Sequence, residues 1–371
     1  MSELVGHNRK TLQKQVMGIS GLTSYMKQVK TDVPARELAG QTIAVDANAC
    51  FYADYAVSVS NVLKDDHDYK ILQHGIDFED VLDRCYWRIR YTVEKWLLLR
   101  INVVLITDGE ATDAKSVTQE SRASVGAKKY NIACESAEKL CELLQIPYLG
   151  GYQMSSEFQE KMKDPQYTTA IQKAWDQISK ALATAIHPTK ADWTQLMIRI
   201  GKDYPTVRIY QSSVEAETLA CYLHLQGEVD HVYSRDSDCA AYGLQQWFFN
   251  WSSFDETFSQ IKRKDLAHAI GIPVARLLDF CIMIGTDYGN RIPEVGPKTA
   301  RQILNHQSLD QYREKERERC DCLNIEECRE IFGLVHAPSY LDLNDLSVRV
   351  FSGIEIRPCT PTPCNTLTIS S

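Results

Sequence analysis

The segment from Val214 to Gly243, VEAETLACYLHLQGEVDHVYSRDSDCAAYG, combines four closely spaced carboxylates with sequence that otherwise has the character of a protein core. The acids form two pairs, Glu215 with Glu217 and Asp236 with Asp238, and one residue separates the members of each pair. An ionised group in an apolar environment is costly unless it is paired or binds a metal ion. The segment therefore indicates either a capped helix followed by a polar turn or a buried cation site.

Local patterns predict a helix followed by a strand in this segment. If the chain stays extended after the strand, Asp236 and Asp238 project to one side and can face a single ion. The apolar positions that predict the helix are Leu219, Ala220, Leu223 and Leu225; Gly227 ends the run, and Val229, Val232 and Tyr233 predict the strand.

The glutamate pair needs a different geometry. Residues two apart on a regular helix point in different directions, so Glu215 and Glu217 converge only in an irregular first turn. Ser212 or Ser213 is the candidate cap of that turn.

Two further aspartates follow short apolar segments. QTIAVDANACFY places Asp46 at the end of a predicted strand, and NVVLITDGEATDAK does the same for Asp108. Ligands collect at the carboxyl ends of strands in an open parallel sheet, where acids distant in sequence can meet. A lone aspartate at a strand end is also common as a helix cap. Asp287 follows an apolar helix in FCIMIGTDYGNRIPEVGPKTARQIL.

Together these positions predict one acidic cluster. Without cations its members would repel strongly, whereas magnesium or manganese ions prefer oxygen ligands and make such a cluster stable. A site of this kind suits phosphodiester hydrolysis with two divalent ions. The members are Asp46, Asp108, Glu215, Glu217, Asp236, Asp238 and Asp287.

Composition limits the class of protein. The chain has 371 residues, of which 44% are hydrophobic and 24% charged, enough for one large or two ordinary globular domains. The sequence lacks an apolar run of membrane-spanning length and an apolar signal segment, so we expect a soluble intracellular protein without membrane contact. Its 12 cysteines are scattered, which favours reduced thiols. A net charge of −8 argues against nonspecific coating of nucleic acid.

Several motifs occur in an order that resembles one family. They are MGISGLTSYMKQV from Met17, VDANACFY, TDGEATDAK, VEAETLACYL, RDSDCAAYG and IGTDYGNRIPEVGPKTA. Between Met17 and about His306 the chain resembles the flap endonuclease and XPG family of structure-specific 5' nucleases, in a compact form typical of a viral member. The resemblance implies an α/β fold with a PIN-like nuclease core, in which helices flank a mainly parallel central sheet, together with a helical cap and a helix-two-turn-helix element.

The resemblance also implies a role for each site residue. Glu215 and Glu217 would ligate one Mg²⁺ or Mn²⁺ ion with Asp46 and Asp108, and Asp236, Asp238 and Asp287 would surround the second. Lys115 and Arg122 would orient the scissile phosphate, and their spacing of seven places them on one face of a helix. Tyr52 would stack on a base beside the cleavage point.

The segment from Asp279 to Leu304 resembles the helix-two-turn-helix element of the family. Gly296, Lys298 and Thr299 would hold a duplex phosphate at a helix start. The family also coordinates a K⁺ ion there through carbonyl oxygens. Glu294 departs from the family pattern, which has glycine at this position.

Domain organisation follows the motifs. We expect an N-terminal extension (1–16), an N-terminal nuclease region (17–122), an enlarged helical cap (123–205), an internal nuclease region with the helix-two-turn-helix (206–310), and a charged helix with a flexible tail (311–371). Translation starts at Met17, or a basic arm precedes it. Ile171, Trp175, Ile178 and Leu182 predict a helix in the cap, which either clamps a single strand or only packs. The tail lacks a clamp-binding peptide, and we expect a monomer.

The expected function is hydrolysis of branched or flap DNA in replication, repair or recombination, in the nucleus or at a site of viral DNA replication. A 5'–3' exonuclease, a junction resolvase and an RNA-cutting relative are alternatives of the same chemistry. A non-catalytic protein that binds branched DNA is an alternative of another class.

Overall fold

The structure is a computed structural model of the chain. It describes residues 18–19, 21–109, 116–333 and 343–345, with only the backbone described at 116–122 and 343–345. The predicted extension (1–16), Met17, Lys115 and most of the predicted tail lie outside these residues.

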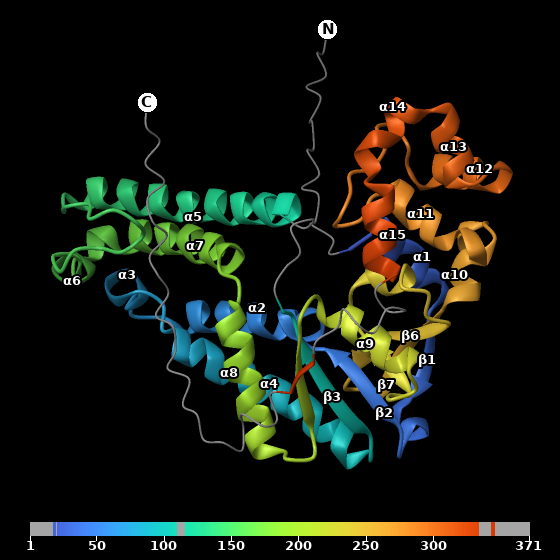
Figure 1. The fold of residues 1–371 in the computed structure, drawn as a ribbon. Helices are drawn as coiled ribbons and strands as arrows, with labels where there is room; N and C mark the ends of the chain where they lie inside the picture. Colours follow the sequence, from blue (N-terminus) through green and yellow to red (C-terminus); the bar gives the residue numbers. More distant parts are fainter. Residues whose placement is uncertain (1–17, 20, 110–115, 334–342, 346–371) are drawn as a thin grey trace, which may run out of the picture.

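One eight-stranded sheet runs through the molecule in the order β1-β7-β6-β5-β2-β3-β4-β8 (Figure 1). The central strands β6, β5, β2, β3 and β4 are parallel to one another, and β1, β7 and β8 are paired in antiparallel fashion at the two edges. The predicted α/β fold with a mainly parallel central sheet is confirmed. The strands are β1 (Thr31–Pro34), β2 (Thr42–Asp46), β3 (Asn102–Thr107), β4 (Arg208–Ser212), β5 (His231–Tyr233), β6 (Gln246–Ser252), β7 (Thr257–Lys262) and β8 (Leu343–Asp345).

Alternation along the strands divides the interior into two cores. In β2, Ile43 and Val45 point into one core while Ala44 points into the other. In β3, Val103 and Leu105 point into the first core, while Val104 and Ile106 point into the second. Successive strand side chains point to opposite faces, so both faces of the central strands are apolar, as expected for a parallel sheet covered by helices.

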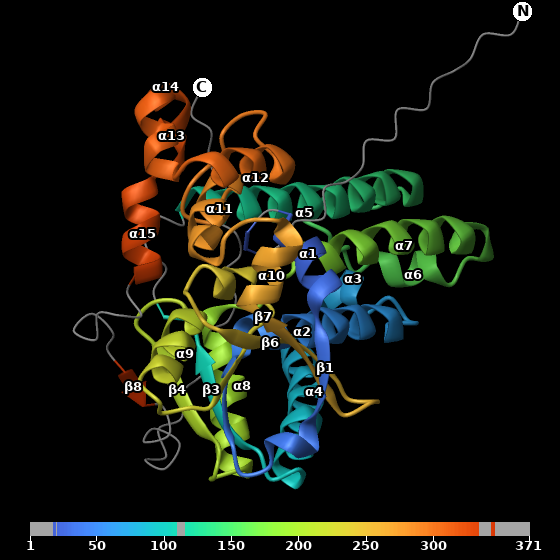
Figure 2. The same cartoon turned by 90° about the vertical axis from the view of Figure 1, so that its right-hand side faces the viewer.

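Helices cover both faces of the sheet (Figure 2). The first core contains side chains of α2, α4, α5, α7 and α8, and the second contains those of α1 and α9–α15. The helices are α1 (Leu22–Val29), α2 (Ala47–Asp65), α3 (Ile71–His74), α4 (Phe78–Leu98), α5 (Ser116–Leu144), α6 (Phe158–Met162), α7 (Thr168–Ala185), α8 (Lys190–Asp203), α9 (Ala216–Leu225), α10 (Arg263–Ile270), α11 (Leu277–Ile284), α12 (Pro297–His306), α13 (Leu309–Lys315), α14 (Arg317–Cys320) and α15 (Ile325–Gly333), with short 3-10 segments η1 (Ala35–Leu38), η3 (Pro165–Tyr167), η4 (Ser237–Ala240), η5 (Val274–Arg276) and η6 (Asp321–Leu323).

Within residues 123–205, whose role as a helical cap stays a prediction, most of α5 and all of α7 lie side by side and extend away from the sheet (Figure 1). The predicted helical pattern is confirmed, because Ile171, Trp175, Ile178 and Leu182 are all buried on α7. This apolar stripe packs α7 against its neighbours, chiefly α5 and α2.

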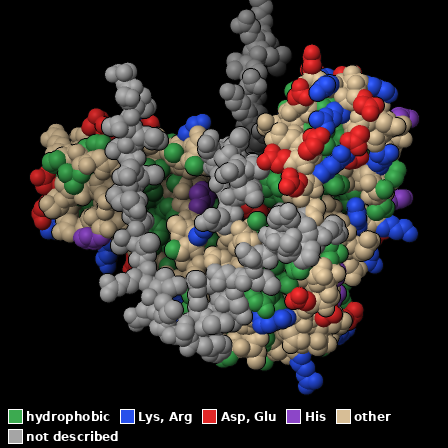
Figure 3. Space-filling view, in the orientation of Figure 1, with side chains coloured by type: hydrophobic (Ala, Val, Ile, Leu, Met, Phe, Trp, Pro, Cys, Tyr) green, Lys and Arg blue, Asp and Glu red, His purple; other side chains and the backbone are tan. Residues whose placement is uncertain are grey.

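Helices α11–α15 form a second helical group on the other side of the sheet. Lys, Arg, Asp and Glu side chains are interspersed over its α13–α15 part (Figure 3). Some of these charged side chains form ion pairs: the Arg329 guanidinium lies 2.7 Å from an oxygen of Asp310 and 3.1 Å from one of Asp279. In the described part of the chain, no helix is by itself long and apolar enough to cross a membrane; α10 together with Val274–Ile284 would be, by length and composition, but the pair is bent by 85°.

Candidate active site

Asp46 ends β2 and begins α2, as its position in the sequence predicts. Its Oδ1 accepts a hydrogen bond from the Ala49 backbone N–H at 3.0 Å, and its Oδ2 accepts one from the Ser234 hydroxyl at 2.6 Å. The side chain is almost completely buried. The carboxylate therefore has a fixed position in the interior, at the carboxyl end of the central strand.

Asp108 directly follows β3, the parallel neighbour of β2. Its Oδ1 accepts a hydrogen bond at 2.9 Å from the N–H of Ala216, the first residue of α9. The next residue, Gly109, donates its N–H to the Val214 carbonyl at 2.7 Å. Asp108 is therefore held against the start of the helix that carries the glutamate pair.

The prediction that Ser212 or Ser213 caps α9 is wrong. Glu215 occupies the cap position without a side-chain cap hydrogen bond, and the Ser212 hydroxyl accepts from the Val214 N–H instead. A carboxylate from another strand, Asp108, satisfies the helix terminus, which local sequence could not reveal.

Three acids come together at this edge of the sheet. Asp46, Asp108 and Glu217 each place a carboxylate oxygen so that all three oxygens lie within 4.8 Å of one another. Glu217 is buried in the first turn of α9, and Asp108 is half-buried. Three convergent carboxylates in a largely buried position are the donor set that a hard divalent cation requires.

Electrostatics support a cation at this position. Burial, followed by repulsion from the Asp108 carboxylate, raises the pKa of Asp46 from its ordinary 3.8 to about 8, against the opposing hydrogen bonds from Ser234 and Ala49. The charge of Asp236 raises it further. A bound cation would remove this repulsion, so the residues present fit a divalent ion.

Asp236 lies beside this group, and the chain from Asp236 to Asp238 forms a turn, so the extended conformation considered from the sequence is absent there. Asp236 is the N-cap of η4, and its Oδ1 accepts the N–H of Asp238 at 2.9 Å. The turn forms because this hydrogen bond satisfies a buried amide locally. Ser234 connects the two parts of the site, since its hydroxyl donates to Asp46 and accepts the Asp236 N–H at 3.0 Å.

Gly18 contacts the same two aspartates. A Cβ at Gly18 would lie 2.1 Å from Asp236 Oδ1 and 2.9 Å from Asp238 Oδ1, so both carboxylates point at this backbone position. The neighbouring Ile19 N–H donates to the Ser237 hydroxyl at 2.8 Å. The start of the described chain is thus fixed at the site.

Glu215 and Asp287 lie around the buried Tyr288. Burial, followed by the charges of Glu217, Asp238 and Glu215, raises the pKa of the Tyr288 phenol. Asp287 precedes Tyr288 in the loop after α11. Asp287 is therefore placed by its neighbour Tyr288, and the roles of Glu215, Asp236, Asp238 and Asp287 as ligands stay predictions.

Two predicted substrate contacts, Tyr52 and Arg122, are placed on helices α2 and α5. The Tyr52 hydroxyl lies 2.6 Å from His187 Nδ1, and the two rings are stacked with centroids 6.1 Å apart. A base that stacks on this face of Tyr52 would have to displace His187. Arg122 is helical, but its side chain and the whole of Lys115 lie outside the described residues.

The predicted phosphate-binding residues lie at the start of α12. Gly296 is its N-cap, and Lys298 and Thr299 are exposed in its first turn. Glu294 has a left-handed backbone with φ of +63°. That conformation favours glycine, which explains in physical terms why Glu294 is unusual at this turn.

Sequence reasoning missed Ser234, Gly18 and His187. Ser234 had a usable signal, because it directly follows strand β5 and lies two residues before Asp236. Gly18 and His187 reach the site through contacts across more than a hundred residues, which no local pattern encodes.

The raised pKa of Asp46 predicts how pH affects stability. Between the unfolded pKa of 3.8 and the folded pKa of about 8, the native state binds the Asp46 proton more tightly. The metal-free protein should therefore lose stability as pH rises through this range. Mg²⁺ competes with the proton, so the rise in Tm that it causes should grow between about pH 6 and pH 8.

Thermal unfolding with and without MgCl₂ checks this expectation. The variant Asp46→Asn should show a flatter dependence of metal-free Tm on pH than the unaltered protein. Equal slopes for the two proteins would contradict the assignment of the raised pKa to Asp46.

Comparison with known proteins locates a family signature in this part of the chain. Residues 206–287, which contain β4, α9, β5, η4 and α11, match the XPG I-region. This segment is therefore similar to the XPG I-region. It contains five of the seven predicted acids, namely Glu215, Glu217, Asp236, Asp238 and Asp287.

Relatives extend the similarity beyond the XPG I-region. The probable RAD2-like endonuclease 369L of Invertebrate iridescent virus 6 is 22% identical over 309 residues, which cover 78% of this chain and 72% of the relative. Exodeoxyribonuclease 1 of Schizosaccharomyces pombe is 21% identical over 298 residues, 78% of this chain but 42% of the relative. The solved flap endonuclease-1 from Methanococcus jannaschii shares 19% identity, with a TM-score of 0.46 and coverage of 82% of this chain and 81% of that chain. The predicted resemblance to XPG-type nucleases is confirmed.

Proposed function

We propose that the protein is a metal-dependent, structure-specific nuclease that hydrolyses DNA at the base of 5' flaps. The observation that carries this proposal is the convergence of Asp46, Asp108 and Glu217 within 4.8 Å at the carboxyl edge of the parallel sheet. Glu217 belongs to the XPG I-region, while Asp46 and Asp108 come from strands outside it. The matched segment and the rest of the sheet thus build one site together.

The proposed division of labour assigns the acids to two ions. Asp46, Asp108, Glu217 and Glu215 would hold the first, and Asp236, Asp238 and Asp287 would surround the second. Divalent ions bound there would activate water and stabilise the charge of the departing oxygen. The chain fixes the ligands in advance: Ala49 and Ser234 orient Asp46, and the start of α9 orients Asp108.

We assign binding of the phosphate and of single-stranded DNA to the cap side. Lys115 and Arg122 would orient the scissile phosphate and offset its charge. Tyr52 would stack on a base, in exchange for its contact with His187. The paired helices α5 and α7 extend from this side of the molecule, which supports a clamp for a single strand, with simple packing as the alternative.

We assign duplex binding to the turn before α12. The N–H groups at Gly296 and at the following first turn would hold a phosphate, assisted by Lys298 and Thr299. Carbonyl oxygens of this turn would coordinate K⁺. The left-handed conformation at Glu294 supports the turn geometry despite the missing glycine.

Cleavage of end-labelled DNA tests the proposal. The panel comprises a 5' flap, a nicked duplex, a four-way junction, a single strand and an RNA flap, each with Mg²⁺ and with EDTA, in KCl and in NaCl. We expect magnesium-dependent incision at the flap base, loss of cleavage with retained binding in Asp236→Ala, and tighter duplex binding in KCl. Preferred degradation from a 5' end, cutting of the junction or cutting of RNA would identify the corresponding alternative. Binding without cleavage would favour the non-catalytic one.

We further propose that the protein acts as a monomer on branched DNA during cellular or viral DNA replication. The similarity to a viral RAD2-like endonuclease supports a role in viral DNA replication. Light scattering of the free protein and of its flap complex would test the monomer.

A further inference from the structure

The loop that carries Asp287 is held by a segment far along the chain. The Asn290 N–H donates to the Cys322 carbonyl at 3.0 Å, and the Asn324 side-chain amide donates to the Tyr288 carbonyl at 3.2 Å. η6 and the start of α15, which follow the XPG I-region, therefore fix the loop backbone on both sides of Gly289.

Gly289 shows how closely the two segments approach. A Cβ at this position would lie 2.3 Å from the Leu323 carbonyl oxygen and 3.0 Å from the Leu323 carbonyl carbon. Both contacts are with backbone atoms, which cannot move aside as a flexible side chain can. The loop and η6 are thus packed backbone against backbone directly after Asp287 and Tyr288.

Asn324 is itself rigidly placed. Its backbone is left-handed, with φ of 47° and ψ of 49°, a conformation that asparagine tolerates better than most residues. Its carbonyl accepts the Cys328 N–H at 2.9 Å in the first turn of α15. Because the Asn324 backbone is held in place, its side-chain amide reaches the Tyr288 carbonyl from a fixed position.

Tyr288 anchors the same loop from the other side. Its ring is buried and packs edge-on against Phe332 of α15, with centroids 5.5 Å apart and an interplanar angle of 81°. Within the loop, Thr286 Oγ1 lies 3.5 Å from Cys328 Sγ. The residues on both sides of Asp287 are therefore tied to α15 or to the turn before it.

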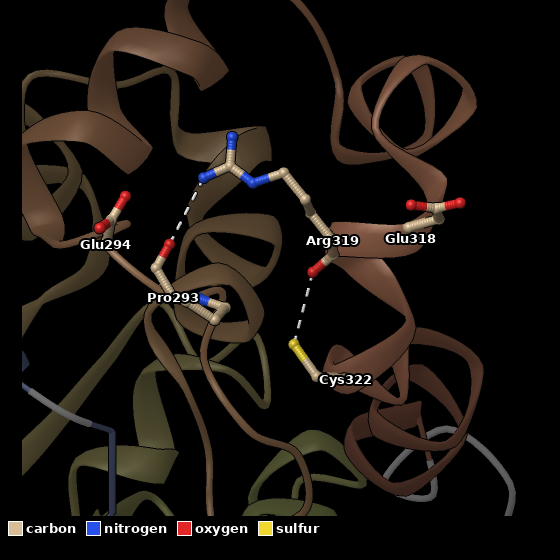
Figure 4. A pocket seen from close by; sticks show the side chains of 5 residues that line it. All are labelled: Pro293, Glu294, Glu318, Arg319 and Cys322. Carbon is tan, nitrogen blue, oxygen red and sulfur yellow. Dashed lines mark hydrogen bonds between the residues drawn. The ribbon is translucent and has the colours of Figure 1, made fainter.

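The loop after α11 and the segment formed by α14 and η6 also meet at a surface pocket (Figure 4). The pocket is lined by Pro293, Glu294, Glu318, Arg319 and Cys322. Arg319 Nη2 donates to the Pro293 carbonyl at 3.4 Å, and Cys322 Sγ donates to the Arg319 carbonyl at 3.4 Å. Loop residues up to Pro293 are thus connected to α14 and η6.

We propose that Asn324 is a positioning residue for the nuclease: through the Tyr288 carbonyl it holds Asp287 where this acid can ligate a divalent ion. The inference rests on the proposed function, because it requires Asp287 to be a ligand. A ligand on a loop that is already ordered loses little conformational entropy when the ion binds. Partners that orient a ligand typically contribute about 10- to 100-fold to metal affinity.

The variant Asn324→Gly removes the amide but keeps a residue that accepts the left-handed backbone. We expect its affinity for Mn²⁺, measured by calorimetry, to fall about 10-fold. We also expect faster hydrogen exchange of the amides from 287 to 290 in the metal-free protein. Cleavage should need a correspondingly higher Mg²⁺ concentration but approach the unaltered rate at saturation.

The matched control is Asn102→Gly. Asn102 also donates its side-chain amide to a carbonyl, that of Gly40 at 3.1 Å, at the opposite end of β3 from Asp108. This variant should leave Mn²⁺ affinity and exchange at 287–290 unchanged.

A double variant tests whether Asn324 acts through Asp287. In an Asp287→Asn background, Asn324→Gly should cause no further loss of Mn²⁺ affinity. A full additional loss, or unchanged affinity in Asn324→Gly alone, would overturn the inference while leaving the proposed function intact. Failure of the unaltered protein to bind Mn²⁺ would overturn the proposed metal site and this inference together.

Discussion

Asp46→Asn is expected to lower the rate of magnesium-dependent DNA cleavage by about 10³-fold or more. The substitution removes one negative charge from the group formed with Asp108 and Glu217, and divalent ions bound there would contribute several kcal/mol to catalysis. Asparagine has nearly the same shape and can still accept the hydrogen bond from the Ala49 N–H, so the fold should persist. Single-turnover cleavage of a 5' flap measures the rate, and circular dichroism checks the fold.

Asp230→Asn is the matched control for this prediction. Asp230 accepts the N–H of Thr42 at 2.8 Å and so binds the opposite end of β2 from Asp46. The control should cleave at the rate of the unaltered protein. Near-normal cleavage by Asp46→Asn would show that this carboxylate is not a ligand of the catalytic ion.

Gly109→Ala is expected to destabilise the protein by about 3 kcal/mol or more. A Cβ at Gly109 would lie 2.0 Å from the Ser212 carbonyl oxygen and 2.6 Å from the Ser213 carbonyl carbon. Both are backbone atoms beside the start of α9, so relief of the clash must separate Asp108 from the helix that it caps. Chemical denaturation in the absence of metal measures the loss.

Gly333→Ala serves as the control, because a Cβ at Gly333 would meet no atom of the described residues within 4 Å. Its effect on the free energy of unfolding should stay within about 0.5 kcal/mol. If the two variants were equally stable, the close approach of residue 109 to the 212–213 backbone would be wrong.

Local sequence was sufficient where a residue's position follows from the element that contains it. Asp46 and Asp108 follow apolar strands, and parallel pairing of those strands brings the two acids together. The helix and strand between Glu217 and Tyr233 were likewise predicted from periodicity. Such features depend only on short-range patterns and on the general geometry of parallel sheets.

Contacts between distant segments explain what the sequence did not reveal. The cap of α9 comes from Asp108 because a neighbouring strand delivers a carboxylate there, so the adjacent serines are not needed. The 3-10 turn at Asp236 depends on burial of the Asp238 amide, and the partner of Tyr52 is His187, 135 residues away. The contacts of Asp108 with Ala216 and of Tyr52 with His187 join distant residues, which no local spacing predicts, whereas the contact of Asp236 with the Asp238 amide is local.

The backbone amides at the acidic site have a consequence for the order of folding and metal loading. Asp46, Asp108 and Asp236 accept backbone N–H groups at the starts of α2, α9 and η4 respectively. These amides act as fixed partial positive charges and offset part of the mutual repulsion of the acids before any cation is present. We therefore expect the polypeptide to fold without a cation, and a divalent ion would bind and leave without unfolding it.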